Sequence, residues 1–197
     1  MSQIAIIDNF LDGYAALEAH AHTLDYSGVI NPVDNVLYPG ISVDVPEQFK
    51  KEIEKKIQQY FNVSDDLFWT SIPLVFRLTL EGTNAPHQAH TDAVMGQYNF
   101  ILYFNDGDEN TGTSILRHKD TGIEIAPGDP ELLQRLHEET NEYSNWEIVE
   151  LCQAKKNRAA IIPSKLYHRA EPVGGFGTTP ASGRLVLLCF FNIGYRE

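Results

Sequence analysis

Three features are scarce in this sequence: cysteine, basic residues and long apolar runs. The only cysteines are Cys152 and Cys189, and both lie in apolar segments, which favours free buried thiols in a reducing compartment over a disulfide-stabilised scaffold. Lys and Arg number 15 against 27 Asp and Glu, which gives a formal net charge of −12. This charge argues against nucleic acid or an anionic membrane as the main partner, because both bind basic surfaces.

The apolar pattern also argues against membrane insertion and secretion. No apolar run approaches the roughly 18 residues of a membrane span. The N-terminus has neither the basic region nor the long apolar region of a signal peptide. We therefore expect a cytoplasmic enzyme or binding domain.

The sequence does have enough apolar residues for a sizeable core. Hydrophobic residues make up 43% of the 197 residues and aromatic residues 11%, and a chain of this length predicts a single domain over 1–197. Apolar residues recur at helical spacing over about 13–24, 46–61 and 129–141. From residue 71 onward, short apolar segments alternate with turn signals, which predicts an all-β sandwich or barrel core.

The most informative motif is His90-Thr91-Asp92, which precedes an apolar run. On a β-strand, side chains at i and i+2 point to the same face, so His90 and Asp92 can offer a nitrogen and an oxygen to one cation. A second histidine from a distant strand would complete a set of two histidines and one carboxylate, and His168 is our candidate. Such a facial triad leaves coordination positions open and is typical of non-haem Fe(II) oxygenases.

The His-x-Asp pattern occurs a second time, at His118 and Asp120. This pair runs directly into Thr121-Gly122 and lacks the apolar strand that follows Asp92. We expect it to form an exposed turn, so the context favours His90 and Asp92 as the metal site.

The segments around His90 follow one another in a distinctive order. They are the loop and motif 86–92, the apolar strand 98–105, the strand 112–117, the apolar run 159–164, the segment 168–173, and a strand that Arg184 opens. This order resembles the Fe(II)/2-oxoglutarate-dependent dioxygenases, specifically their prolyl-4-hydroxylase-like branch. The resemblance implies a mainly β (α+β) chain whose core is a double-stranded β-helix, or jelly roll. Residues 1–70 would form helical support, and the core 71–193 would carry a helical insertion at about 121–156.

The resemblance also implies roles for individual residues. His90, Asp92 and His168 match the iron ligands, and Arg184 and Tyr103 match residues that bind the far carboxylate of 2-oxoglutarate. A planar guanidinium suits bidentate recognition of a carboxylate. Fe(II), 2-oxoglutarate and O₂ would then couple oxidative decarboxylation of 2-oxoglutarate to hydroxylation of a small molecule or of a peptide or protein side chain.

Three further residues are candidate substrate contacts. His87 precedes the motif closely enough to approach the metal, and Arg117 and Trp146 lie on or beside the expected mouth of the site. Each also has a simpler interpretation: a loop histidine, a surface arginine and a core aromatic residue, respectively.

Two other classes of function stay open from the sequence. The same triad could belong to a cupin-like metal-binding module or to a metal-dependent hydrolase without oxygenase activity, or the histidines could bind nothing in a structural protein. Arg184 and Tyr103 distinguish the oxygenase from the hydrolase, because a hydrolase needs no buried clamp for a dicarboxylate. The oligomeric state does not follow from the sequence.

Overall fold

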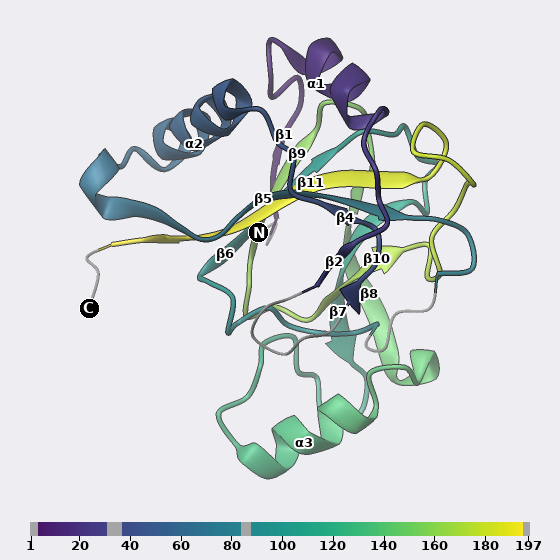
Figure 1. Cartoon of the computed structure of the whole chain (residues 1–197). Coiled ribbons are helices and arrows are strands. Elements are labelled where there is room, and N and C mark those ends of the chain that lie inside the picture. The colour runs from purple at the N-terminus through teal and green to yellow at the C-terminus, as the bar shows by residue number, and fades with distance from the viewer. Residues whose placement is uncertain (1–3, 31–36, 84–87, 195–197) are drawn as a thin grey trace.

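The computed structural model describes residues 4–30, 37–83 and 88–194, and its core is a pair of antiparallel β-sheets (Figure 1). The six-stranded sheet has the order β1 (Ala5–Ile7), β9 (Ala159–Pro163), β6 (Tyr98–Tyr103), β11 (Arg184–Ile193), β5 (Phe68–Thr79) and β4 (Ile41–Ser42). The three-stranded sheet has the order β10 (His168–Glu171), β7 (Gly112–His118) and β8 (Trp146–Gln153). A separate short pair joins β2 (Val29–Ile30) and β3 (Leu37–Tyr38).

Strand alternation gives the large sheet two apolar faces. On β6, Phe100 and Leu102 belong to the core cluster that includes residues of the N-terminal helices, whereas Ile101 and Tyr103 belong to a second cluster with Ile115 of β7. Successive side chains of a strand point to opposite faces, so the helices cover one face and the small sheet covers the other. The order of layers is therefore helices, large sheet and small sheet. This arrangement confirms the predicted mainly β jelly roll.

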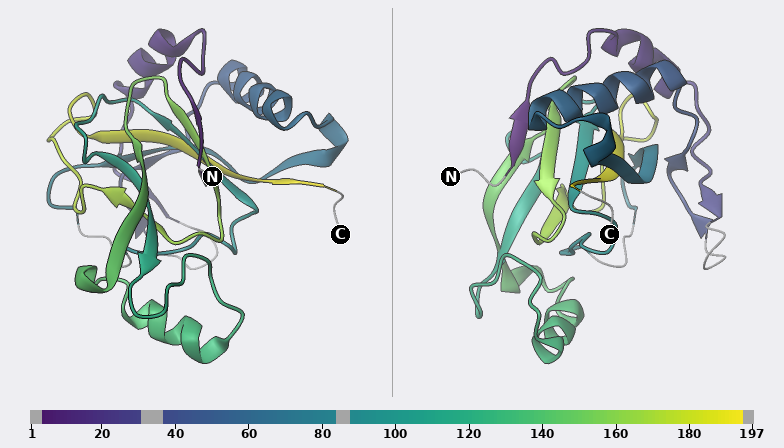
Figure 2. Two further views of the ribbon diagram at one scale, coloured as in Figure 1. Left: turned by 180° about the vertical axis from the view of Figure 1, so that it is seen from behind. Right: turned by 90° about the vertical axis from the view of Figure 1, so that its left-hand side faces the viewer.

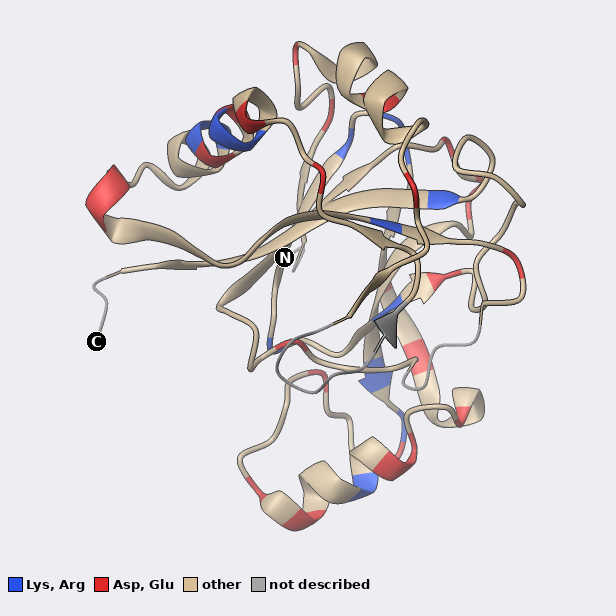
Figure 3. Ribbon diagram, viewed as in Figure 1, with Lys and Arg blue, Asp and Glu red and all other residues tan. Residues whose placement is uncertain are grey.

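The two N-terminal helices follow from the apolar spacing. Helix α2 (Glu47–Phe61) begins after Pro46, buries Phe49, Ile53 and Ile57 on one stripe, and ends at Asn62 in the left-handed conformation. Lysine and glutamate residues occupy its outer side (Figure 3). Helix α1 (Tyr14–Ala21) is shorter than the predicted 13–24. Its last turn tightens into hydrogen bonds three residues apart, such as Thr23 N–H to His20 O at 3.0 Å.

The excursion between β7 and β8 carries helix α3 (Pro130–Glu138), which lies at the opposite end of the molecule from α1 and α2 (Figures 1 and 2). The Asp129 carboxylate caps α3 by accepting the Glu131 N–H at 2.9 Å. Strand β8 lies within the predicted insertion of about 121–156, and it pairs with β7, with one register shift, as part of the small sheet. The strand β5 starts before residue 71.

Two predictions about hydrophobic residues can be compared with this fold. Cys152 and Cys189 are both free and buried, as expected. Among the residues that the structure describes, none of the helices combines the length and the hydrophobicity of a membrane span.

Candidate functional site

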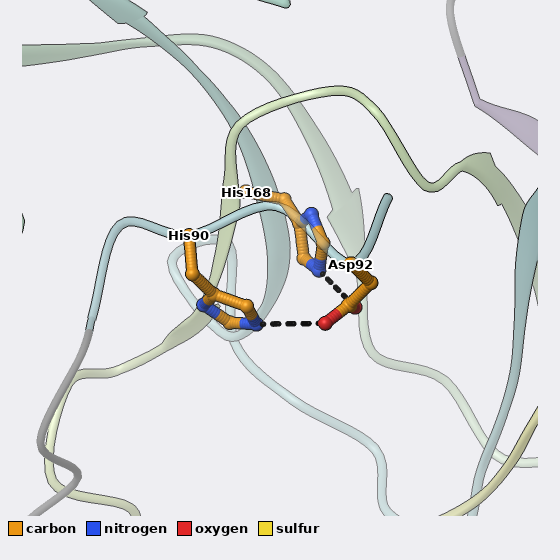
Figure 4. Close-up of side chains that lie close together, drawn as sticks. All are labelled: His90, Asp92 and His168. Atoms are coloured by element: carbon orange, nitrogen blue, oxygen red, sulfur yellow. Dashed lines mark ion pairs between the residues drawn. The ribbon is translucent and has the colours of Figure 1, made fainter. Parts of the chain in front are cut away.

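The side chains of His90, Asp92 and His168 converge on one point at the open edge of the small sheet (Figure 4). His168 begins β10, and His90 pairs with it as an isolated antiparallel bridge. The Asp92 backbone N–H donates to Ser164 O at 2.8 Å, which fixes the segment 90–92 beside the loop that leads into β10. One ligand atom from each of the three side chains lies within 4.8 Å of the others, a spacing that a single metal ion can bridge.

Hydrogen bonds at the back of both imidazoles leave their outer nitrogens for a ligand. His90 Nδ1 lies 2.9 Å from Gln88 O, and His168 Nδ1 lies 2.9 Å from Leu166 O. A carbonyl oxygen only accepts, so each Nδ1 carries the proton and each Nε2 faces the Asp92 carboxylate. The Nε2 atoms lie 3.7 Å (His90) and 3.0 Å (His168) from that carboxylate. Backbone carbonyls that fix the tautomer in this way are typical partners of metal-binding histidines.

Asn99 of β6 orients the carboxylate. Its Nδ2 donates to Asp92 Oδ2 at 3.2 Å, and the Asn99 Oδ1 is buried without a hydrogen-bond partner among the described residues. Asn99 therefore contacts Asp92 from the inner face of the large sheet, whereas the three converging side chains come from the small sheet and its edge.

The electrostatics suit a cation. Burial, and next the charge of His168, lower the pKa of His90 to about 4, so His90 is neutral near pH 7. Burial acts to raise the pKa of Asp92, but the hydrogen bond and charge of His168 outweigh it and hold that pKa below its usual value. For His168, burial is opposed by the hydrogen bond to Asp92, and the pKa is raised. The site offers a neutral imidazole and a carboxylate, and a metal that binds His168 Nε2 would displace the proton from that nitrogen.

A second polar cluster lies deeper between the sheets, around Thr113 of β7. The Tyr103 hydroxyl donates to Thr113 Oγ1 at 2.8 Å, and Arg184 Nη2 lies 3.4 Å from the same oxygen. Tyr103 is 1% exposed and Arg184 is 7% exposed. Gly112, which precedes Thr113, permits the close approach of β8 to β7, because a Cβ at its φ of +153° would collide with the backbone carbonyl of Cys152.

The buried guanidinium of Arg184 lacks a counter-ion within the described residues. Its Nε has no hydrogen-bond partner there, and none of the described carboxylates forms an ion pair with it. Burial lowers the pKa of Arg184, but a guanidinium keeps its proton in proteins. Burial also raises the pKa of Tyr103, which keeps this hydroxyl a neutral donor. An anion between the two sheets would accept hydrogen bonds from both groups. The charge of Arg184 acts to lower the pKa of His168, which indicates that the cluster adjoins the metal site.

The second His-x-Asp pair does not converge, and the expectation of an exposed turn was wrong for His118. This histidine is fully buried, with Nδ1 3.0 Å from Thr121 Oγ1 and Nε2 2.9 Å from Glu139 Oε2. Asp120 instead binds Arg135 Nη2 at 2.9 Å. The pair connects the excursion around α3 to the end of β7.

The three candidate substrate contacts have different outcomes. Arg117 shares a face of β7 with Thr113 and Ile115 by alternation, but Glu124 binds its Nε at 2.7 Å and Glu147 binds its Nη1 at 3.0 Å. Trp146 is buried, and its indole N–H donates to the Glu139 carbonyl at 2.9 Å. Its neighbours are those of a core residue: Ala89, Leu116, Leu136 and Tyr167. His87 lies outside the described residues.

Our sequence analysis missed three polar residues of the inner faces: Arg77, Asn99 and Thr113. Arg77 interrupts an apolar strand in the same way as Arg184 does, and this pattern could have drawn attention to it. The alternation of β6 places Asn99 on the face of Ile101 and Tyr103. No sequence signal distinguished Thr113 from other strand threonines.

The sequence itself matches a described protein family over almost its whole length. Residues 1–191 match a family described as "Family of unknown function (DUF6445)". The chain belongs to this family. Comparison of this DUF6445 chain with curated proteins found no match.

Solved structures show what the fold is similar to. AviO1 from Streptomyces viridochromogenes Tue57 has a TM-score of 0.56 and 15% identity, covering 95% of this chain and 89% of its own. EctD from S. alaskensis, solved with 2-oxoglutarate and 5-hydroxyectoine, has a TM-score of 0.54 and 10% identity, with coverages of 97% and 72%. An oxidoreductase of the 2OG-Fe(II) oxygenase family from Burkholderia pseudomallei has a TM-score of 0.53 and 10% identity, with coverages of 99% and 88%.

At these identities the likeness concerns the fold. The DUF6445 chain has the jelly roll found in 2-oxoglutarate- and Fe(II)-dependent oxygenases. The comparisons do not single out the prolyl-4-hydroxylase-like branch, which stays a prediction.

Proposed function

We propose that this protein is an Fe(II)- and 2-oxoglutarate-dependent oxygenase. The observation that carries the proposal is the convergence of two imidazole Nε2 atoms and one carboxylate at the edge of a jelly roll. Two histidines and one carboxylate leave positions open for further ligands, which typifies non-haem Fe(II) oxygenases. His90, Asp92 and His168 would hold the metal, and Asn99 would keep the carboxylate in place.

Arg184, Tyr103 and Thr113 would bind the far carboxylate of 2-oxoglutarate. The unpartnered Nε of Arg184 fits this role, because a buried guanidinium is stabilised by an anion that accepts its N–H groups. The Tyr103 hydroxyl can turn from Thr113 to the same anion. With both bound, Fe(II) and 2-oxoglutarate supply O₂ activation coupled to oxidative decarboxylation. The residues of the chain bind, orient and shield these groups from water.

The buried clamp formed by Arg184, Tyr103 and Thr113 favours an oxygenase over a cupin-like binding module or a metal-dependent hydrolase. Neither alternative explains why the guanidinium of Arg184 lies between the sheets beside the triad without a carboxylate partner among the described residues. The product is a hydroxylated small molecule, peptide or protein side chain. The motif order supports the prolyl-4-hydroxylase-like branch, and the net charge of −12 argues against nucleic acid or an anionic membrane as substrate.

A thermal-shift experiment with redox-stable Mn(II) tests this proposal. We expect Mn(II) to raise the melting temperature and 2-oxoglutarate to raise it further only when the metal is present, because the cosubstrate chelates the metal. Asp92→Ala should remove both effects, and Arg184→Gln should remove only the second. An equal 2-oxoglutarate effect without metal, or no metal effect in the wild type, would contradict the proposal.

A further inference from the structure

A second strand arginine, Arg77, lies on the inner face of the large sheet. In β5 it pairs with Val186 of β11 and Ile41 of β4. Its neighbours Phe76 and Leu78 belong to the cluster beneath the helices. Successive side chains alternate, so Arg77 points to the opposite side, toward the small sheet.

The layering of the sheets places Arg77 opposite the metal-binding edge. Tyr103 of β6 contacts Thr113 of β7, so these two strands face each other. One strand further along in each sheet, β11 faces β10. In agreement, the charge of Arg184 on β11 acts to lower the pKa of His168 on β10. The next strand of the large sheet is β5, and the next segment of the small sheet is 90–92. Arg77 therefore faces the segment that carries His90 and Asp92.

Charge interactions agree with this placement. Asp92 favours the charged form of Arg77, and the charge of Arg77 in turn lowers the pKa of His90 and of Arg184. Arg77 is thus close to both the candidate metal site and the candidate clamp for 2-oxoglutarate. It lies on the β5 side, whereas Arg184 contacts Thr113 on the β7 side.

Arg77 differs from most other arginines in its lack of partners. Within 4–30, 37–83 and 88–194, it forms neither a hydrogen bond nor an ion pair. Every other described arginine except Arg184 has a carboxylate partner: Arg117 with Glu124, Arg135 with Asp120, Arg158 with Asp8 and Arg169 with Glu171. The two arginines without such partners both face the space between the sheets. Arg184 is buried and Arg77 is partly buried, and a guanidinium removed from water is stabilised by an anion that accepts its N–H groups.

We propose that Arg77 binds a carboxylate of the primary substrate, so that the enzyme acts on a small carboxylic acid such as a free amino acid. This inference rests on the proposed oxygenase function. One guanidinium matches one monoanionic carboxylate in bidentate geometry. Asp92 forms no ion pair with Arg77 among the described residues, and its Oδ2 is occupied by His168 Nε2 at 3.0 Å and Asn99 Nδ2 at 3.2 Å.

The proposal has a consequence for the substrate class. A residue inside a protein chain has no free main-chain carboxylate, so Arg77 favours a free acid over an internal peptide residue. A carboxylate held beside the triad would fix the distance between the metal and the carbon that reacts.

The test uses full-length protein loaded with Fe(II) and 2-oxoglutarate. Succinate formation in air is measured with the free L-amino acids as probes, each compared with its carboxamide. We expect at least one acid to stimulate succinate formation and its amide to stimulate about tenfold less or weaker still. Arg77→Gln should raise the half-saturating concentration of that acid by about tenfold or more, and Arg77→Lys should have a smaller effect.

Two controls separate this inference from the proposed function. Arg135→Gln removes an arginine charge from the exposed side of α3 and should respond to the acids as the wild type does. The melting temperature and the visible band of the Fe(II)–2-oxoglutarate chelate report folding and cosubstrate binding in each variant. Arg77→Gln should retain both.

Several results would overturn the assignment of Arg77. These are an amide as effective as its acid, an unchanged response of Arg77→Gln, or a wild type that shows the band and responds to none of the acids. Loss of the band in Arg77→Gln would assign this arginine to 2-oxoglutarate instead. A wild type without the band would contradict the proposed function itself.

Discussion

His90 and His168 donate backbone hydrogen bonds to each other, with N–O distances of 3.1 and 2.9 Å. Their imidazole centroids lie 4.5 Å apart. Backbone hydrogen bonds thus hold together two histidines from distant parts of the sequence. Side-chain substitutions at this site should therefore change ligand binding more than folding.

The first prediction concerns the carboxylate of the triad. Asp92→Ala should weaken Mn(II) binding by at least about a hundredfold, since loss of a metal-binding group should cost no less than the 10- to 100-fold typical of an outer partner. Isothermal titration calorimetry measures the affinity. Asp120→Ala is the matched control, because Asp120 belongs to the other His-x-Asp pair and binds Arg135. Equal losses in both variants, or none in Asp92→Ala, would refute the choice of site.

The second prediction concerns Asn99. Asn99→Ala should weaken Mn(II) binding by roughly tenfold, because its amide holds Asp92 Oδ2 at 3.2 Å and such outer partners contribute 10- to 100-fold to metal affinity. The same titration measures the effect. An Asn99→Ala protein with wild-type metal affinity would show that Asp92 needs no such support.

The third prediction concerns the clamp. Arg184→Gln should weaken 2-oxoglutarate binding by tenfold to over a hundredfold, because a hydrogen bond to a charged group contributes about 1.5–3 kcal/mol. Tyr103→Phe should weaken it by roughly tenfold or less. Both variants should bind Mn(II) with unchanged affinity, measured in the absence of 2-oxoglutarate. Loss of metal binding in either variant would indicate a structural role for that residue.

The fourth prediction concerns pH and the pair formed by His118 and Glu139. Hydrogen bonds, first from Arg135 and then from His118, lower the pKa of Glu139 from 4.5 to about 2. A carboxyl group whose pKa is lower in the folded state stabilises the protein above the unfolded pKa, and this stabilisation is lost as pH falls toward the folded pKa. The difference in unfolding free energy between wild type and Glu139→Gln should therefore shrink between about pH 5 and pH 2.

Urea unfolding at several pH values measures that difference, and metal titration at pH 7 provides the control. Because the pair connects the α3 excursion to β7 and not to the triad, Glu139→Gln should bind Mn(II) as the wild type does. A constant difference across the pH range would show that the Glu139 carboxylate contributes nothing through its charge.

The sequence was most informative where a short pattern sufficed. The i, i+2 spacing of His90 and Asp92 required only that this segment be extended, and apolar alternation predicted most strands of the core. The pairing with His168 depended on the resemblance, because no local pattern connects two strands so far apart. The choice of Arg184 also depended on the resemblance, and it agrees with the rule that a charged residue in an apolar strand needs an anionic partner.

The errors also have physical causes. His118 was expected to be exposed because a turn follows it, but α3 folds back over β7 and supplies Glu139 as its partner. The strand β8 falls within the predicted insertion because the resemblance does not extend over about 121–156, although β8 pairs with β7. For Trp146 two interpretations were open, and its burial and its hydrogen bond to the Glu139 carbonyl agree with the core aromatic residue.

The most direct test of the central claim is an anaerobic titration of the Fe(II)-loaded protein with 2-oxoglutarate, monitored in the visible region. Chelation of the metal by the cosubstrate produces a weak charge-transfer band. We predict that this band appears in the wild type, is absent in Asp92→Ala, and requires a higher concentration of 2-oxoglutarate in Arg184→Gln. Stoichiometric Fe(II) binding without any band would contradict the account.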